Sequence, residues 1–453
     1  MSTVVTVTLN PTVDVAFEGD RLISEGGNRA RRCSVSRGGG GINVARCVGR
    51  LGGSAVALHT AGREVGARLD RLLDEEGLDH RRIEVGSDTR DANVPAGDDV
   101  PSRTGANPIS NDMATDDTRG MTDSNPSSVP SAPDHPTVLA AMRLASRAPS
   151  VHNTQPWRWE FDGTRLHLRR DNDRLLSAAD PLGRQLVISC GAMLHHVRTA
   201  FAAQGWHTDT TRLPDPEQPD YLAVIDFRGW PDPPDSVLAR ARAIDRRHTD
   251  RLPMLPPRDW PQLVHTARML VTFHDLELSV LDDSVRSRLA AASEQATAMR
   301  RYDMEYQSEL RWWVGHSSGP EGIPRNALVS DAESARVSVG RKYPSAPHSA
   351  RRDTLEDQSR LLMLSSITDS QIDWLYTGEA LSALLLECTA AKLATCALTH
   401  ITELPTGRKA LASLLPHPGV PQVVIRIGTA PDDEAETPPT PRRPLADILT
   451  MRH

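Results

Sequence analysis

Lysine, cysteine and aromatic residues are all scarce in this 453-residue sequence. Only three of the 52 basic residues are lysine, and the five cysteines are widely spaced, with no CxxC pair. An odd number of separated cysteines argues against a disulfide framework and against a zinc site of paired thiolates. We therefore expect reduced thiols and no metal site.

Long hydrophobic runs and a basic surface are also missing. No stretch reaches 18 consecutive apolar residues, so we expect no membrane span. The first residues lack the basic and apolar regions of a signal peptide, which predicts a cytoplasmic protein. The net charge is −7, and −6 of it lies in 88–135, where nine Asp outnumber three Arg. The rest is almost neutral, so we expect no nucleic-acid partner.

The length predicts two or three folded units, at roughly 150 residues per domain. Residues 1–87 combine β-branched strands with a glycine-rich loop and short helices, which is typical of an α/β segment. Residues 88–135 hold too few apolar side chains to offset the entropy of ordering, and we expect a disordered acidic linker.

Residues 136–453 form the main body and favour an α+β fold, because strands and helices do not alternate strictly. Apolar periodicity predicts a helix from Pro136, and others over 184–204 and 377–394. Strands are expected at 165–169, 221–227, 361–367 and 422–428.

The sharpest motif is APSVHNTQPWRW at 148–159. Between its two prolines lie five polar side chains with donors and acceptors in both directions: Ser150, His152, Asn153, Thr154 and Gln155. Such a set suits a heteroaromatic ring with alternating N–H and C=O edges, for example a flavin. The alternative interpretation is a polar turn that Trp157 and Trp159 anchor in the core.

Two arginine motifs offer sites for a phosphate. The segment RRHTDR contains Arg246, Arg247, Thr249 and Arg251, and TPRRP contains Arg442 and Arg443. Guanidinium and hydroxyl groups bind a phosphate dianion through charge-assisted hydrogen bonds. The alternatives are a solvated basic face for the first motif and a surface tail for the second.

The order of these motifs, with the helix GEALSALLLECTAAKLATC between the last two, resembles the nitroreductase superfamily over 136–453. The similarity is greatest to its Acg-type NAD(P)H nitroreductases. The resemblance implies an α+β sandwich that binds FMN at a dimer interface. It also implies NAD(P)H as electron donor and a small-molecule acceptor of nitroaromatic or quinone type.

In this family the phosphate motif usually comes first, whereas here PSVHNTQPW precedes RRHTDR. That order predicts an internally duplicated pseudo-dimer with halves 136–235 and 236–453, one FMN site and a chain able to act as a monomer. The resemblance places Ser150, His152, Asn153, Gln155 and Thr399 near the ring. It places Arg246, Arg247, Thr249, Arg251, Arg442 and Arg443 around the phosphate.

The implied chemistry takes place on the flavin, so no catalytic acid or base is expected. Two alternatives remain open for this body. One is an FMN-sequestering protein with little turnover, in which the polar region 316–358 covers the site. The other is a structural protein without a cofactor.

Residues 1–90 carry a second resemblance. TLNPTVD at 8–14 and GGGGINVAR at 38–46 are similar to the opening of a PfkB-type sugar kinase, which has a ribokinase-like α/β fold. The resemblance implies a vestigial sugar site at Asp14, Gly39, Gly41 and Asn43. No GAGD-type motif follows, so we expect a kinase remnant fused to a flavoprotein, or a misjoined gene start, without kinase activity. A sugar-phosphate-binding module is the remaining alternative.

Overall fold

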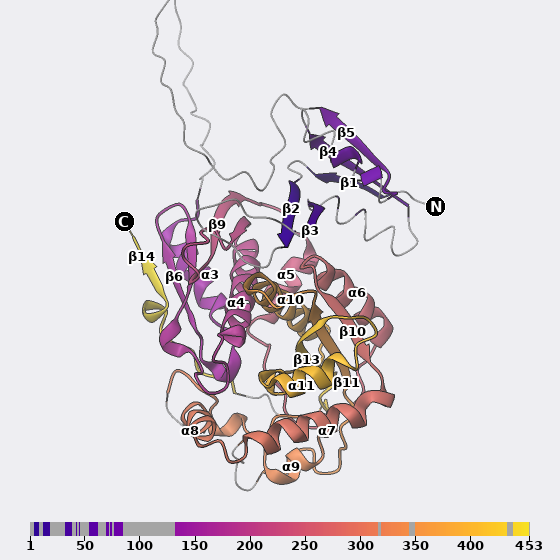
Figure 1. Ribbon diagram of the computed structural model, residues 1–453. Helices are drawn as coiled ribbons and strands as arrows, with labels where there is room; N and C mark the ends of the chain where they lie inside the picture. The colour runs from indigo at the N-terminus through magenta and orange to yellow at the C-terminus, as the bar shows by residue number, and fades with distance from the viewer. Residues whose placement is uncertain are drawn as a thin grey trace, which may run out of the picture. The chain divides into compact units, whose positions relative to one another are not determined.

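The computed structural model forms two compact units, Met1–Pro126 and Ser127–His453, which are described separately (Figure 1). The structure describes the larger unit from residue 132 and the N-terminal unit only in part. The described residues are 4–8, 12–18, 32–38, 42, 45, 54–61, 69–71, 73–74, 77–84, 132–315, 319–343, 349–432 and 438–452. The predicted linker lies almost wholly outside them.

The N-terminal unit contains a parallel sheet in the order β1-β4-β5 (Val4–Thr8, Ala55–Ala61 and His80–Glu84). A separate antiparallel pair joins β2 (Thr12–Glu18) to β3 (Arg32–Gly38). Leu69 and Leu73, one helical turn apart, are fully buried with Ala57 of β4. A parallel sheet with a helix packed on it agrees with the α/β segment expected here.

The first sheet of the larger unit has the order β14-β6-β7-β9-β8. Neighbouring strands among β6 to β9 are antiparallel (Trp157–Phe161, Leu166–Arg170, Trp206–Arg212 and Tyr221–Gly229). Helix α3 (His135–Ala145) precedes β6, and α4 (Arg184–Ala203) connects β7 to β8. The Asp134 side chain caps α3 by accepting a hydrogen bond from the Thr137 amide at 2.9 Å.

The second sheet repeats this topology, with the order β10-β11-β13-β12 and antiparallel neighbours throughout. Its strands are Glu277–Leu281, Arg360–Ser366, Ala394–Leu398 and Val420–Gly428. Helix α6 (Trp260–Thr272) precedes β10, and α10 (Gln371–Ala390) connects β11 to β12. Each half is therefore helix, two strands, a 20-residue helix and two strands, with the same strand order.

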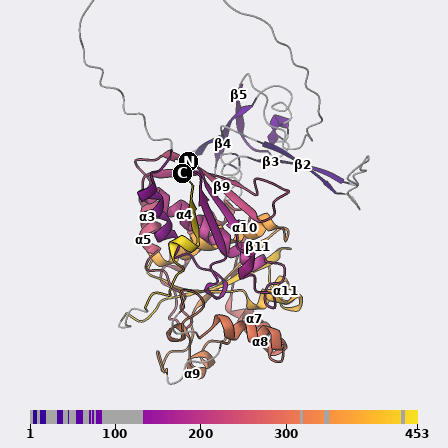
Figure 2. The same ribbon diagram turned by 90° about the vertical axis from the view of Figure 1, so that its left-hand side faces the viewer.

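The second half carries an insertion between β10 and β11. It contains α7 (Asp283–Arg300), α8 (Met304–Trp313) and α9 (Asp331–Ala335), which gather at one end of this unit in both views (Figure 1, Figure 2). Helix α5 (Asp235–Ala243) joins the halves, and α11 (Pro405–Ala412) lies between β12 and β13. The insertion overlaps the polar region that the sequence marks at 316–358.

The helices α4 and α10 pack against each other between the two sheets. Gly191 and Gly378 are each the eighth residue of their helix, and both backbones approach closely there. A Cβ atom at Gly191 would lie 2.1 Å from the Leu375 carbonyl oxygen, and one at Gly378 would lie 2.0 Å from that of Ile188. The contact is thus two-fold symmetric in position, as in an isologous interface.

The end of the described chain returns to the first half. Strand β14 (Leu449–Met451) pairs in parallel with β6, and Ile448 and Leu449 belong to the same core as Trp157 and Trp159. The first sheet is therefore completed by residues that follow the second half in the sequence.

Helix α4 is long and apolar enough to cross a membrane by length and composition, within the described residues. However, 83% of its apolar window is buried inside the protein. Its side chains contact both sheets and α10, which is the environment of a core helix.

Buried histidines in this core predict a loss of stability in mild acid. His196 is fully buried with its Nδ1 atom 2.7 Å from the Ser382 hydroxyl, and burial holds its pKa well below the usual value. Burial also lowers the pKa of His195 to about 3 and that of His274 to about 4. The unfolded chain binds protons at these rings below about pH 6.5, so stability should fall as the pH drops from about 6.5 towards 4.

The measurement is urea unfolding at about pH 7.5 and about pH 5 for the parent and His196→Gln, because the variant removes one of these proton-binding differences. The fall in the free energy of unfolding between the two pH values should be roughly 1–2 kcal/mol smaller in the variant than in the parent. His265→Gln, at an exposed position of α6, should behave like the parent. Equal losses in His196→Gln and the parent would show that His196 is protonated in the folded state.

Candidate functional site

Two adjoining cavities lie where the 149–155 turn meets the second half. The inner cavity offers about 990 Å³ of unfilled space, part of it open to solvent, and its lining comes mainly from the turn, α4, the segment 396–400 and the insertion. The second, which we call the arginine cavity, is lined by seven arginines. The two share six wall residues: Pro149, Ser150, His152, Thr249, Arg251 and Val329.

The turn that separates the cavities has an unusual backbone. His152, Asn153 and Gln155 have φ angles of 47°, 58° and 52°, a left-handed conformation that costs free energy for residues with a side chain. Hydrogen bonds hold it there. The Ser150 hydroxyl accepts from the Gln155 amide at 3.0 Å, and the Asn153 side-chain amide donates to the carbonyl of Gly322 at 2.9 Å. Strain maintained by such contacts is a frequent property of binding sites.

His152 reaches the wall of both cavities. It is 5% exposed, and its Nδ1 atom has no hydrogen-bond partner among the described residues. Burial holds its pKa well below the usual value, and the charges of Arg341 and Arg251 lower it further. A neutral, buried ring nitrogen without a partner is available to a bound molecule.

Three arginines converge beside the turn: Arg147, Arg247 and Arg442, which we call the arginine cluster. The Arg442 guanidinium donates to the carbonyls of Ser146 and Arg147, both at 2.9 Å. Arg247 is 6% exposed, and its Nε–H has no partner among the described residues. None of the three forms an ion pair with a carboxylate in the described part of the chain.

Burial without a carboxylate partner lowers the pKa values of this cluster. Burial, together with the charge of Arg147, lowers the pKa of Arg247 to about 10. Burial and the charges of Arg247 and Arg147 also hold the pKa of Arg442 well below its usual value. Asp245 offsets part of the charge of Arg147. Buried cations without a bound anion are costly, so the cluster is suited to bind one.

Other buried arginines of this region are paired. Arg341 lies 2.7 Å from a Glu403 carboxylate oxygen, Arg352 lies 2.8 Å from Asp250, and Arg426 lies 2.7 Å from Asp357. Their charges are satisfied inside the protein. The contrast makes the arginine cluster the candidate anion site of these two cavities.

The structure brings most of the predicted site residues together. Ser150, His152, Thr249, Arg251 and Thr399 line the inner cavity. Asn153, Arg246, Arg247 and Arg442 line the arginine cavity, and Arg246 is exposed there.

Gln155 and Arg443 line neither cavity. The Gln155 side-chain oxygen accepts from the Arg443 amide at 2.8 Å, and the Arg443 guanidinium donates to the Gln155 carbonyl at 3.1 Å. They join the turn to the segment that leads into β14.

Several cavity residues carry no signal in the motifs. Arg147 follows α3, Gln185 lies in the first turn of α4, and Arg341, Tyr343 and His400 come from the insertion and the turn after β12. Gln185 accepts a hydrogen bond from the Thr399 hydroxyl. Only the three-dimensional structure shows that Arg147 lines the arginine cavity and that the other four line the inner cavity.

Of the predicted sugar-site residues, Asp14 lies in β2. Gly39, Gly41 and Asn43 lie outside the described residues.

Comparison with known proteins assigns the larger unit. The chain is 43% identical over 316 residues to "Putative NAD(P)H nitroreductase acg" of Mycobacterium tuberculosis, which covers 70% of this chain and 96% of that protein. The chain therefore belongs to the Acg-type NAD(P)H nitroreductases, a family of oxidoreductases, and the predicted resemblance is confirmed.

The N-terminal segment has different relatives. Residues 6–94 match the model of the pfkB family carbohydrate kinases. Over 92 residues the chain is 38% identical to an ATP-dependent 6-phosphofructokinase isozyme 2 of M. tuberculosis, which covers 20% of this chain and 26% of that protein. A solved structure of Escherichia coli phosphofructokinase-2 is also 38% identical, over 20% of this chain and 30% of its own, with a TM-score of 0.19. The predicted kinase-like segment is confirmed in sequence.

Proposed function

We propose that the larger unit is an FMN-dependent oxidoreductase that passes electrons from NAD(P)H to a nitroaromatic or quinone-like acceptor. The observation that carries this proposal is the pair of adjoining cavities, one partly apolar and one containing the arginine cluster. A flavin mononucleotide has the same two parts, a flat ring and a single phosphate. On this proposal, the protein acts in the cytoplasm, without nucleic acid or membrane.

The donor set fits that cofactor. Arg147 and Arg247 would hold the phosphate, and Arg442 adds positive charge while its N–H groups fix the turn. Ser150, His152 and Thr399 would face the ring. The flavin, when bound, supplies the two-electron chemistry, whereas these residues bind it, orient it and keep water away.

We further propose that one chain takes the place of a dimer and holds one FMN. The repeated strand order and the symmetric contact of α4 and α10 support this. The site combines the turn of the first half with Thr249, Arg251 and Thr399 of the second. The flavin should therefore remain bound on dilution, which light scattering and flavin fluorescence can follow together. Flavin loss in step with dissociation of a dimer would contradict this.

The proposed function predicts the identity of the cofactor. The protein should purify yellow, and the flavin released by denaturation should be FMN. The arginine cluster supplies charge for one phosphate, and the sequence has no GxGxxG loop for a pyrophosphate. Chromatography of the released flavin gives the answer. Recovery of FAD, or no binding of added FMN, would reject the proposal.

A storage role is the second candidate, and the insertion favours it. Val329, Val337, Arg341 and Tyr343 from this segment line the inner cavity and can restrict access to it. Anaerobic addition of NADPH distinguishes the two roles. Rapid loss of the absorbance of oxidised flavin supports turnover, whereas a flavin that stays oxidised supports storage.

A further inference from the structure

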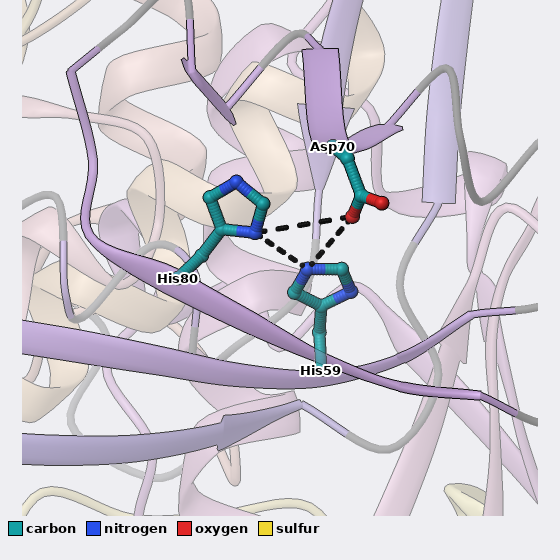
Figure 3. A group of neighbouring side chains, drawn as sticks. All are labelled: His59, Asp70 and His80. Atoms are coloured by element: carbon teal, nitrogen blue, oxygen red, sulfur yellow. Dashed lines mark hydrogen bonds and ion pairs between the residues drawn. The ribbon is translucent and has the colours of Figure 1, made fainter.

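Two histidines and an aspartate converge in the N-terminal unit, far in sequence from the cavities (Figure 3). His59 lies in β4, and His80 is the first residue of β5. The parallel register pairs Ala57 with His80 and His59 with Arg82, so both imidazoles are on the same face of the sheet. Asp70 comes from the helical residues 69–71 that cover this face.

The three ligand atoms form a small triangle. The Nε2 atom of His59 lies 3.1 Å from Nδ1 of His80 and 3.4 Å from Oδ1 of Asp70. The third side, from Nδ1 of His80 to Oδ1 of Asp70, is 3.8 Å. Ligands about 2.0–2.1 Å from a tetrahedral metal ion lie roughly 3.3–3.4 Å from one another. The triangle therefore matches the face that three ligands present to one ion.

Neighbouring groups orient the ligands as an outer shell does in metalloproteins. The second ring nitrogen of His80, Nε2, lies 3.2 Å from Oδ1 of Asp74. The other carboxylate oxygen of Asp70 lies 3.0 Å from the Arg82 guanidinium. Carboxylates that fix a histidine tautomer, and donors that fix a ligating carboxylate, typically change metal affinity by about 10- to 100-fold.

The burial of the ligand atoms also favours a bound cation. His59 is 0% exposed, and Oδ1 of Asp70 has no hydrogen-bond donor among the described residues. Arg82 pairs with the other carboxylate oxygen, so Oδ1, which faces two imidazole nitrogens, has no partner of its own among the described residues. A cation between the three atoms would provide one.

We propose that His59, Asp70 and His80 bind a divalent transition-metal ion, with Zn²⁺ as the first choice. Two imidazole nitrogens and one carboxylate oxygen are a donor set that Zn²⁺ accepts, and they leave a fourth position for water. The ion joins β4, β5 and the helix, and so stabilises a small sheet. The proposal is independent of the flavin site.

The test uses the full-length protein, stripped with a chelator and titrated with Zn²⁺ against a chromophoric competitor. After dialysis, mass spectrometry of the elements should find one zinc per chain. Asp70→Asn and His80→Gln should each weaken binding at least about tenfold, and Asp74→Asn about tenfold. The matched control is His265→Gln, which should keep the parent affinity because His265 is exposed on α6, outside this unit.

Thermal unfolding distinguishes variants that lose metal binding from variants that do not fold. Without metal, Asp70→Asn should unfold close to the temperature of the parent, since it keeps the size of the side chain and loses only a partly exposed ion pair with Arg82. Added Zn²⁺ should raise only the melting temperature of the parent. Zinc retained equally by the parent, Asp70→Asn and His80→Gln would overturn the proposal, as would no retained zinc. The three residues would then form a hydrogen-bonded group without a metal.

Discussion

Replacing Gly378 with alanine should destabilise the larger unit by about 3 kcal/mol or more, at the upper end of overpacking effects. The new Cβ atom would lie 2.0 Å from the Ile188 carbonyl oxygen and 2.7 Å from the Ala192 amide nitrogen. Both are backbone atoms of a buried helix, so no side chain can move aside. The helices must separate, and flavin affinity should fall as well, because Ile188, Ala192 and Leu381 line the inner cavity.

Urea unfolding of the flavin-free protein and an FMN titration measure the two effects. Gly191→Ala should behave similarly, since its Cβ atom meets the Leu375 carbonyl oxygen in the equivalent position. The double variant should lose less free energy of unfolding than the two single variants lose together, because helices that one methyl group has already separated have room for the second. Gly319→Ala is the control, with its nearest atom 3.7 Å away. Wild-type stability of Gly378→Ala would show that the helices pack further apart.

Replacing Arg247 with methionine should weaken FMN binding about 10- to 100-fold while leaving the flavin-free protein at least as stable as the parent. The loss follows from charge-assisted hydrogen bonds to the phosphate, worth about 1.5–3 kcal/mol each. The opposite effect on stability follows from burial, which lowers the pKa of Arg247 to about 10 because the folded protein disfavours its charge. Methionine fills similar space without that cost.

Quenching of FMN fluorescence gives the affinity, and thermal unfolding of the flavin-free protein gives the stability. The neighbouring Arg246 is exposed, so Arg246→Met should change the FMN affinity by no more than about threefold, as is usual for surface charges. Parental affinity in Arg247→Met would show that the phosphate binds elsewhere. Loss of both stability and affinity would show that Arg247 is structural.

The main helices of the larger unit could be predicted from periodicity, but the residues at which they begin and end could not always be predicted. Helix α4 was expected over 184–204 and is Arg184–Ala203, because its apolar residues follow one helical repeat. Helix α10 was expected over 377–394 and is Gln371–Ala390. Its start depends on a capping box between Ser370 and Asp373.

The end of α10 was harder to predict. Lys392 ends the helical region with a φ of 59°, a conformation in which glycine is the expected residue. The apolar residues then continue into β12, so the predicted helix runs past Ala390 and reaches Ala394, the first residue of that strand. Strand β6 was missed as well, since its tryptophans were interpreted as anchors of a turn.

The site was predictable as motifs but not as geometry. The 149–155 turn and RRHTDR stood out because polar and basic residues cluster locally. Arg147 did not, because it lies 100 residues from Arg247 and 295 from Arg442, and no local pattern connects them. Gln155 and Arg443 contact each other and line neither cavity, and this placement depends on the same long-range packing.

The return of β14 to the first sheet bears on biosynthesis. At roughly 5–20 residues per second, a ribosome needs about 15–60 s to make the 295 residues between Arg147 and Arg442. The edge of β6 lacks its parallel partner until β14 is made, and the glycine face of α4 lacks its partner until α10 is made. Until then each surface is open to aggregation or to chaperones. On the proposed function, cofactor loading would be a late event, and a nascent chain stalled before residue 442 would have a first half without a completed sheet and without Arg442.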